Sequence, residues 1–180
     1  SLDWEAPADS AVTGYRIEKS TDGATWSTVE SDSGSSATSY VVSGLTNGRT
    51  YYLRVTPLTG AVAGAVAVAS ALPATLPGRA TGLEASSGAV GEATLRWTAP
   101  VSSGGYPVIG YLIETSGDGR TWAAAVANTG EATAAYTLSG LTSGVAIQVR
   151  VSAITVAGAG PASTSATVSA LGLASAPRGL

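Results

Sequence analysis

The chain has 180 residues with a formal net charge of −3, and only 12% of them are charged against 44% that are hydrophobic. Its nine Lys and Arg residues are spread along the sequence, so no basic cluster is available to bind a nucleic acid or a charged membrane surface, and no apolar run approaches the ~18 residues of a membrane-spanning helix. Because Cys and His are both absent, disulfides and thiol chemistry are excluded, and the commonest metal ligand and general base are missing.

Short strands separated by turn residues account for the first half of the chain. Val, Ile, Tyr, Trp and Thr alternate with polar residues at a period of two, which is typical of strands with one buried face. Asp22-Gly23 lies between two such segments and is a strong hairpin signal, because Gly adopts a positive φ at little cost. We expect strands near residues 1–5, 14–20, 25–30, 39–43, 50–58 and 65–71.

A short segment, residues 72–78, separates this half from the next. It contains Pro73 and Pro77, which stiffen a connection and remove backbone donors. The second half shows the same alternation and a second turn signal at Asp118-Gly119. We expect strands near residues 81–86, 92–98, 108–115, 121–127, 134–139, 146–155 and 163–170, and no segment has a sustained helical period.

The two halves repeat one another. Trp26 recurs as Trp122, an offset of 122 − 26 = 96, and Trp4 recurs as Trp97, an offset of 97 − 4 = 93. The difference of three residues is explained by one longer loop in the second half. A period of this length is a whole small domain rather than one turn of a solenoid. The sequence therefore predicts two separate cores.

The motifs and their order resemble the fibronectin type III family. The resemblance implies an all-β fold of two Ig-like β-sandwiches in tandem, residues 1–73 and 74–173. Leu2 matches Leu95 with nothing before it, so the first sandwich is expected to lack its opening strand. The motifs that carry the resemblance occupy residues 2–7, 14–18, 22–26 and 44–51 of the first half, and residues 77–83, 95–100, 110–114, 118–122, 139–141 and 158–161 of the second.

The resemblance also implies which residues form the two cores. Tyr51 falls where the family has its tyrosine corner, in which the phenol hydroxyl bonds to nearby backbone. Ile147 stands at the matching position of the second half and would keep the burial but lose that hydrogen bond. The expected core residues are Trp4, Tyr15 and Tyr51 in the first half, and Trp97, Tyr111 and Ile147 in the second.

The last seven residues form a segment of their own. Residues 174–180 resemble residues 77–83, through Pro177 and Leu180. Two interpretations stay open. The segment starts a third module of a longer array, or it acts as a donor strand that completes the open module of an identical chain, since a missing strand leaves an exposed edge.

Two pairs of opposite charge recur on strands that the resemblance makes neighbours. Glu18 and Arg54 form one pair, and Glu114 and Arg150 form the other. A carboxylate and a guanidinium together can bind a ligand. Outward-pointing pairs of this kind are, however, ordinary surface contacts worth well under ~1 kcal/mol, and we favour that interpretation.

Two aromatic residues are candidates for contact with a partner. Tyr52 and Tyr106 are expected to be exposed, and an exposed ring can stack on a sugar or on a surface protein. Scattered surface aromatics are also ordinary and need no function. A sugar or protein contact at these residues therefore remains a hypothesis.

No nucleophile–base pair or metal cluster is visible in the sequence, so we expect no catalysis, no cofactor and no metal. We expect a structural spacer or adhesion module array of an extracellular or cell-surface bacterial protein, such as a repeating segment of a fibre or filament. The alternatives are linker modules of a secreted polysaccharide-degrading enzyme, or a decorating segment of a phage virion or tail. The expected partners are neighbouring modules of the same or an identical chain, a glycan or a surface protein, without nucleic acid and without insertion into a membrane.

Overall fold

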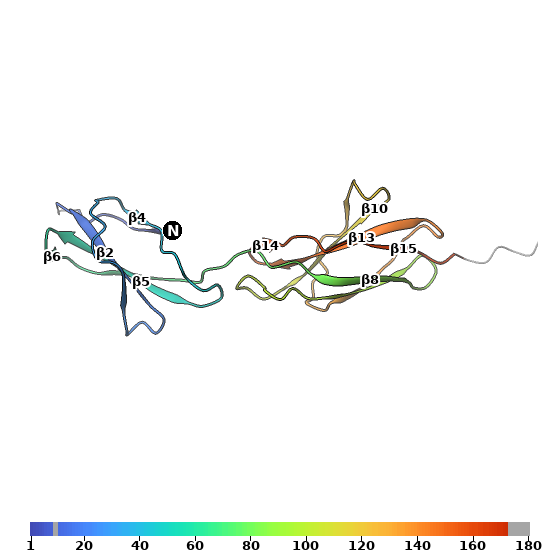
Figure 1. Ribbon diagram of the computed structural model, residues 1–180, viewed down its shortest axis with the longest axis horizontal. Coiled ribbons are helices and arrows are strands. Elements are labelled where there is room, and N and C mark those ends of the chain that lie inside the picture. Colours follow the sequence, from blue (N-terminus) through green and yellow to red (C-terminus); the bar gives the residue numbers. More distant parts are fainter. Residues whose placement is uncertain (9–10, 173–180) are drawn as a thin grey trace, which may run out of the picture. The chain divides into compact units, whose positions relative to one another are not determined.

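Strands form all the regular structure of the part of the chain that is described, residues 1–8 and 11–172, in the computed structural model (Figure 1). The chain divides into two compact units, Ser1–Ala74 and Thr75–Leu180. The all-β fold is confirmed. The donor-strand or third-module segment, residues 174–180, lies outside the described residues.

The first unit is built from two sheets. Strand β1 pairs with β4 in a two-stranded sheet, and the other sheet has the order β3-β2-β5-β6, with β7 also paired to β5. Strands β2 and β5 run antiparallel along seven paired positions and form the centre of the larger sheet. The strands are β1 (Leu2–Asp3), β2 (Gly14–Ser20), β3 (Ser27–Glu30), β4 (Ser39–Tyr40), β5 (Tyr51–Thr59), β6 (Val62–Ala63) and β7 (Ala67–Ala71).

The second unit repeats this plan with one more strand. Its smaller sheet has the order β12-β9-β8, and its larger sheet has the order β11-β10-β13-β14, with β15 also paired to β13. The strands are β8 (Thr81–Ser87), β9 (Ala93–Thr98), β10 (Gly110–Ser116), β11 (Ala123–Val126), β12 (Ala135–Leu138), β13 (Ala146–Thr155), β14 (Gly158–Ala159) and β15 (Ala166–Ser169).

The hairpin between β2 and β3 is fixed by one aspartate. The Asp22 carboxylate accepts the backbone N–H groups of Thr25 and Ala24 at 2.7 and 2.8 Å, and Gly23 adopts a φ of 73°. These hydrogen bonds lower the pKa of Asp22. A short side chain that bonds its own turn in this way favours the turn over a continued strand.

The same turn recurs between β10 and β11. Asp118 accepts the backbone N–H groups of Thr121 and Arg120, each at 2.8 Å. Those bonds, with a further one from the Ser116 hydroxyl, lower the pKa of Asp118 to about 2. Both aspartates thus stabilise hairpins, as their place next to a glycine predicts.

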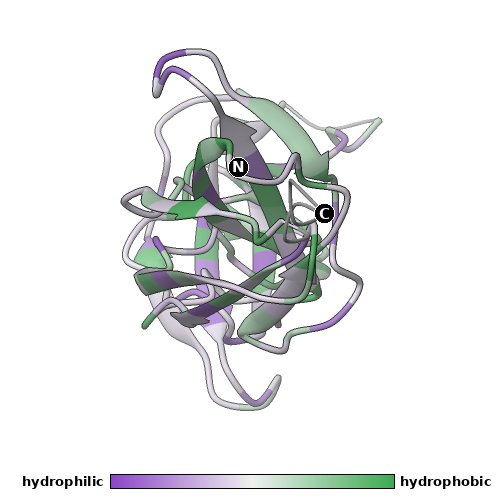
Figure 2. Ribbon diagram, turned by 90° about the vertical axis from the view of Figure 1, so that its right-hand side faces the viewer, coloured by the Kyte–Doolittle hydropathy of each residue, from purple (hydrophilic) through white to green (hydrophobic). Residues whose placement is uncertain are grey.

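Each core contains one tryptophan packed edge-on against one tyrosine. The ring centroids of Trp97 and Tyr111 lie 4.8 Å apart at an interplanar angle of 70°, and those of Trp4 and Tyr15 lie 4.9 Å apart at 68°. Edge-to-face contact is a favoured geometry for aromatic pairs. Figure 2 shows that the hydrophobic residues are concentrated on the strands, whereas the protruding loops are mostly pale or hydrophilic.

The tyrosine at the start of β5 makes the hydrogen bond expected of a tyrosine corner. Tyr51 is buried, and its hydroxyl accepts the backbone N–H of Thr46 at 3.2 Å. This bond lowers the pKa of Tyr51. At the matching position of β13, Ile147 is partly buried against the second core and has no hydroxyl to offer.

Candidate functional site

Among the described residues, the smaller sheet has two strands in the first unit and three in the second. In the second unit, β9 lies between β12 and β8. The matching strand of the first unit, β1, pairs with β4, and no strand of the described residues pairs with its other edge. The described residues therefore contain no counterpart of β8 in the first unit, as the match of Leu2 with Leu95 predicts.

Two residues that are buried in the second unit have more exposed counterparts in the first. Leu95 and Trp97 are 0% and 7% exposed, whereas their counterparts Leu2 and Trp4 are only half-buried. Trp4 was expected in the core and is only half-buried, because no strand of the described residues pairs with the outer edge of β1. Every residue of β7 is likewise exposed.

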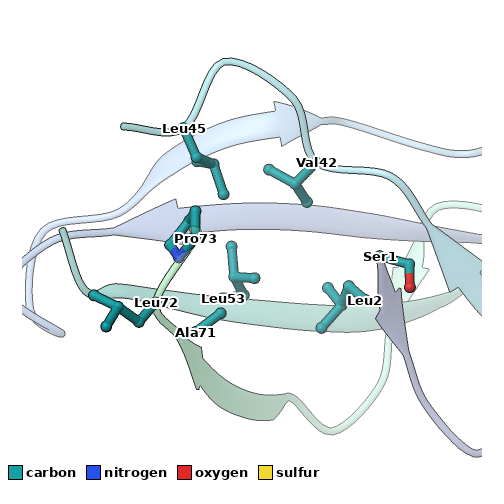
Figure 3. Close-up of a pocket in the computed structure, with 8 residues that line it drawn as sticks. All are labelled: Ser1, Leu2, Val42, Leu45, Leu53, Ala71, Leu72 and Pro73. Carbon is teal, nitrogen blue, oxygen red and sulfur yellow. The ribbon is translucent and has the colours of Figure 1, made fainter. Parts of the chain in front are cut away.

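The uncovered positions join into a groove between β1 and β7, with β5 as its floor. Leu2, Val42 and Leu53 line one hollow of about 250 Å³. Figure 3 shows their side chains pointing into it, with Ala71 at its border. A second hollow shares Leu2 and Leu53 with the first, and its other lining residues also come from β1, β5, β7 and the residue that follows β1. We call this surface the β1–β7 groove, and define it by Leu2, Trp4, Leu53, Val55, Ala67 and Ala71.

The β1–β7 groove is lined mainly by apolar side chains. Its walls are aliphatic and aromatic, with acidic Asp3 and Glu5 beside Trp4. An open strand edge offers backbone hydrogen bonds, and adjoining apolar hollows select the side chains of an added strand. No acid–base pair lines the groove among the described residues.

A second notable arrangement joins a tryptophan, an arginine and a glutamate on the outer face of the larger sheet. Arg54 donates from Nε and Nη2 to the Glu18 carboxylate at 2.6 and 2.9 Å. Its guanidinium lies 4.3 Å from the ring centroid of Trp26. The hydrogen bonds from Arg54 lower the pKa of Glu18, and the same pairing raises the pKa of Arg54.

The cross-strand pairing is confirmed, but one member of the pair is more buried than an ordinary surface contact would be. Glu18 and Arg54 are indeed direct cross-strand partners, but Glu18 is only 7% exposed. The reason is that Trp26, at the end of the β2–β3 hairpin, packs over the guanidinium and takes water away from the pair. Such a stack of arginine on indole combines a bidentate ion pair with a cation–π contact.

The second unit repeats this stack. Arg150 donates to the Glu114 carboxylate through two bonds of 2.8 Å, and its guanidinium lies 4.3 Å from the ring centroid of Trp122. The pairing with Glu114 raises the pKa of Arg150. Sequence reasoning missed both tryptophans, although an aromatic residue that recurs together with each Glu–Arg pair was a usable signal.

The two tyrosines proposed for partner contact lie in different environments. Tyr52 is 37% exposed, and its ring lies over the hairpin glycine, 3.7 Å from where a Cβ of residue 23 would stand. Tyr106 was expected to be exposed and is half-buried. It follows a loop that hydrogen bonds hold against residues 75–78, from Thr75 N to Gly104 O and from Gly78 N to Ser102 O, so the loop does not project into solvent.

Two kinds of feature are absent from the part of the chain that the structure describes. No helix there is long and apolar enough to cross a membrane. No group of three or more Asp, Glu, His or Cys side chains in that part of the chain is placed to hold a metal ion.

Solved structures of other proteins share this fold. Chicken CNTN1 domains FN1–FN3 are similar at 20% identity and a TM-score of 0.50, covering 92% of this chain and 58% of that one. Titin domains A168–A170 are similar at 16% identity and a TM-score of 0.53, covering 84% and 52%. This chain thus spans less than two thirds of either structure. The family model described as "Fibronectin type III domain" matches residues 1–69 and 78–169, and the chain therefore belongs to the fibronectin type III family.

Proposed function

We propose that the chain is a non-catalytic segment of a module array, which acts as a spacer and adhesion scaffold in an extracellular or cell-surface bacterial protein. Fibronectin type III domains are generally non-catalytic structural modules, and they typically occur in extracellular or surface proteins. The proposal extends those properties of the family to this chain.

The main support for the proposal is that the same arrangements of polar side chains occur in both units. The Trp–Arg–Glu stack and the aspartate-closed hairpin occur once in each unit with nearly the same distances. In both units these groups bond to each other and to their own backbone. Catalytic groups are instead arranged around a place for a reacting atom. The duplicated groups therefore serve the stability of the modules.

The connection between the units supports a spacer role. The carbonyl of Pro73 accepts the N–H of Gly48 at 2.9 Å, within the first unit, and the N–H of Thr75 donates to the carbonyl of Gly104 at 2.8 Å, within the second. Each end of the connection is therefore tied to its own unit. Few residues of the connection can therefore extend when the chain is pulled, as is suitable for a spacer that transmits tension.

An adhesion role would fall on the exposed aromatic residue of β5. Tyr52 is partly exposed, and it lies two residues before Arg54 on β5, so both point to the same face of the sheet. Aromatic rings bind the apolar faces of sugars or of partner proteins. Tyr106, which is half-buried, is the weaker candidate and supplies a matched control.

A glycan array and single-molecule force spectroscopy test the proposal together. As a spacer, the full chain should unfold in two separate steps, one for each unit, because each has its own core. As an adhesin, it should in addition bind a glycan, and Tyr52→Ala should abolish the binding while Tyr106→Ala leaves it unchanged. A single cooperative unfolding step, or turnover of a substrate by the isolated chain, would overturn the proposal.

A further inference from the structure

The hairpin between β2 and β3, together with the start of β5, borders a hollow of about 380 Å³ in the first unit. Its lining combines aromatic rings with hydroxyl groups, one carboxylate and one ammonium group. Sites for small polar ligands have this mixture of apolar walls and a few polar groups. We call it the hairpin hollow, and define it by Lys19, Thr21, Thr25, Trp26, Ser27 and Tyr51.

Lys19 is the unusual residue of the hairpin hollow. Side chains alternate between the two faces of a strand, so Lys19 lies on the same face of β2 as the buried Tyr15 and Ile17. It is half-buried, and it forms no ion pair with any residue that the structure describes. A cation that is partly removed from water without a counter-ion costs stability. An anion from outside the chain would therefore be bound favourably here.

A second positive charge lies beside the same hollow. The guanidinium of Arg49 is 5.9 Å from the ring centroid of Tyr51. The pKa of Tyr51 is lowered mainly by its hydrogen bonds with Thr46, and the charges of Arg49 and Lys19 lower it further. The carboxylate of the lining, Asp22, already accepts two N–H groups of its own hairpin. The two cations thus outnumber the one carboxylate at this place.

Comparison with the second unit shows which of these residues the fold requires. The aspartate, threonine and tryptophan of the hairpin recur there at an offset of 96, and they form the same turn and the same stack. The residues that carry the positive charges and the other polar groups of the lining do not recur. Lys19, Thr21, Ser27, Arg49 and Tyr51 are replaced by Thr115, Gly117, Ala123, Val145 and Ile147. Since the second unit folds without these five residues, the fold leaves them available for a ligand.

We propose that the hairpin hollow binds a sugar that carries a carboxylate, as in a chain of uronic acids. The sugar carboxylate would pair with the ammonium of Lys19, and Arg49 would add attraction at longer range. The three hydroxyl side chains of the lining can exchange hydrogen bonds with sugar hydroxyls, and its two aromatic rings supply an apolar wall. A peptide carboxylate would use the ammonium group but would leave these hydroxyls unused, so the lining favours a sugar.

This site goes beyond the adhesion contact proposed for Tyr52 and does not depend on it. Tyr52 lies on the outer face of the larger sheet with Arg54, whereas Lys19 lies on the face of β2 that carries the core residues. The ligands differ as well, because stacking on Tyr52 requires no charge on the sugar.

Titration of the ¹⁵N-labelled full chain with trigalacturonate, followed by NMR, tests the proposal. The fully methyl-esterified trisaccharide is the control, since it keeps the rings and hydroxyls and lacks the negative charge. With trigalacturonate, the amide signals of residues 19–27 and the indole signal of Trp26 should shift with a millimolar dissociation constant. The signals of residues 115–123 and of Trp122 should stay in place, and the ester should bind about tenfold more weakly.

Variants separate this site from the outer face. Lys19→Thr introduces the residue of the second unit, and it should weaken binding of trigalacturonate about tenfold. Lys19→Met, which keeps the apolar stem, should do the same, and the dispersion of the amide spectrum checks that each variant is folded. Arg49→Val should weaken binding several-fold, and Tyr52→Ala should leave it unchanged.

Three results would overturn the proposal: no binding of trigalacturonate, equal binding of the ester, or unchanged affinity in both Lys19 variants. Loss of binding in Tyr52→Ala alone would also overturn it, and would place the contact on the outer face instead. None of these results bears on the two-step unfolding expected of a spacer.

Discussion

Leu2 and Leu95 occupy matching positions of the two units, and replacing each with alanine measures how much coverage by β8 adds to the stability of the second unit. Leu95 lies between two neighbouring strands and is completely buried, so Leu95→Ala leaves a closed cavity and should cost about 3 kcal/mol. Leu2 is half-buried and faces an existing hollow. Leu2→Ala therefore removes part of a contact without creating an enclosed void, and about 1 kcal/mol is expected from the apolar area that is lost.

Urea unfolding monitored by hydrogen-exchange mass spectrometry distinguishes the two units, because peptides from each unit report the unfolding transition of that unit. With a slope of ~1.5 kcal/mol per M for a domain of this size, Leu95→Ala should lower the midpoint of the second unit by roughly 2 M. The shift of the first unit in Leu2→Ala should stay below about 1 M by the same conversion. Equal losses in both units, or a larger loss for Leu2→Ala, would refute the account of an open groove.

Three further predictions concern the second unit. Ile147→Tyr should restore the corner hydrogen bond, add about 1 kcal/mol and raise the melting temperature by roughly 4–8 °C, while Ile147→Phe, which lacks the hydroxyl, should not. Folding lowers the pKa of Asp118 from 3.8 to about 2, so the charged carboxylate stabilises the folded state fully above the unfolded pKa, and this stability is lost as the pH falls toward 2. Asp118→Asn should therefore be less stable than the native chain at pH 6 and equally stable near pH 2. A difference in stability that does not change with pH would contradict this. Trp122→Ala should cost about 2 kcal/mol through lost packing and cation–π contact. It should also make the free energy of unfolding more sensitive to salt, because the Arg150–Glu114 pair becomes exposed. Equal salt dependence in the variant and the native chain would show that the indole does not shield the pair.

Sequence reasoning was most effective for features set by local backbone preference and by repetition. The hairpins at Asp22 and Asp118 follow from an aspartate before a glycine, and the two separate units follow from the repeat of Trp4 as Trp97. Each depends on neighbours in the sequence or on comparison of the two halves, and both kinds of information are present in one chain.

The sequence was less informative where burial depends on contacts between distant segments. Alternation along β2 places Glu18 on the outer face, but it does not show that Trp26 covers that face. Tyr106 looks like a loop residue, yet the hydrogen bonds that hold its loop join backbone groups far apart in sequence. Trp4 has the right residue type for a core, but it is only half-buried, because no strand of the described residues pairs with the outer edge of β1.

Hydroxyl-radical footprinting of dilute full-length protein tests the central claim most directly, since it measures in one sample whether the two related cores are covered alike. The account predicts faster oxidation of Leu2 and Trp4 than of Leu95 and Trp97, because β8 covers the second pair and no described strand covers the first. Equal protection of both pairs at concentrations where the chain is monomeric would contradict it.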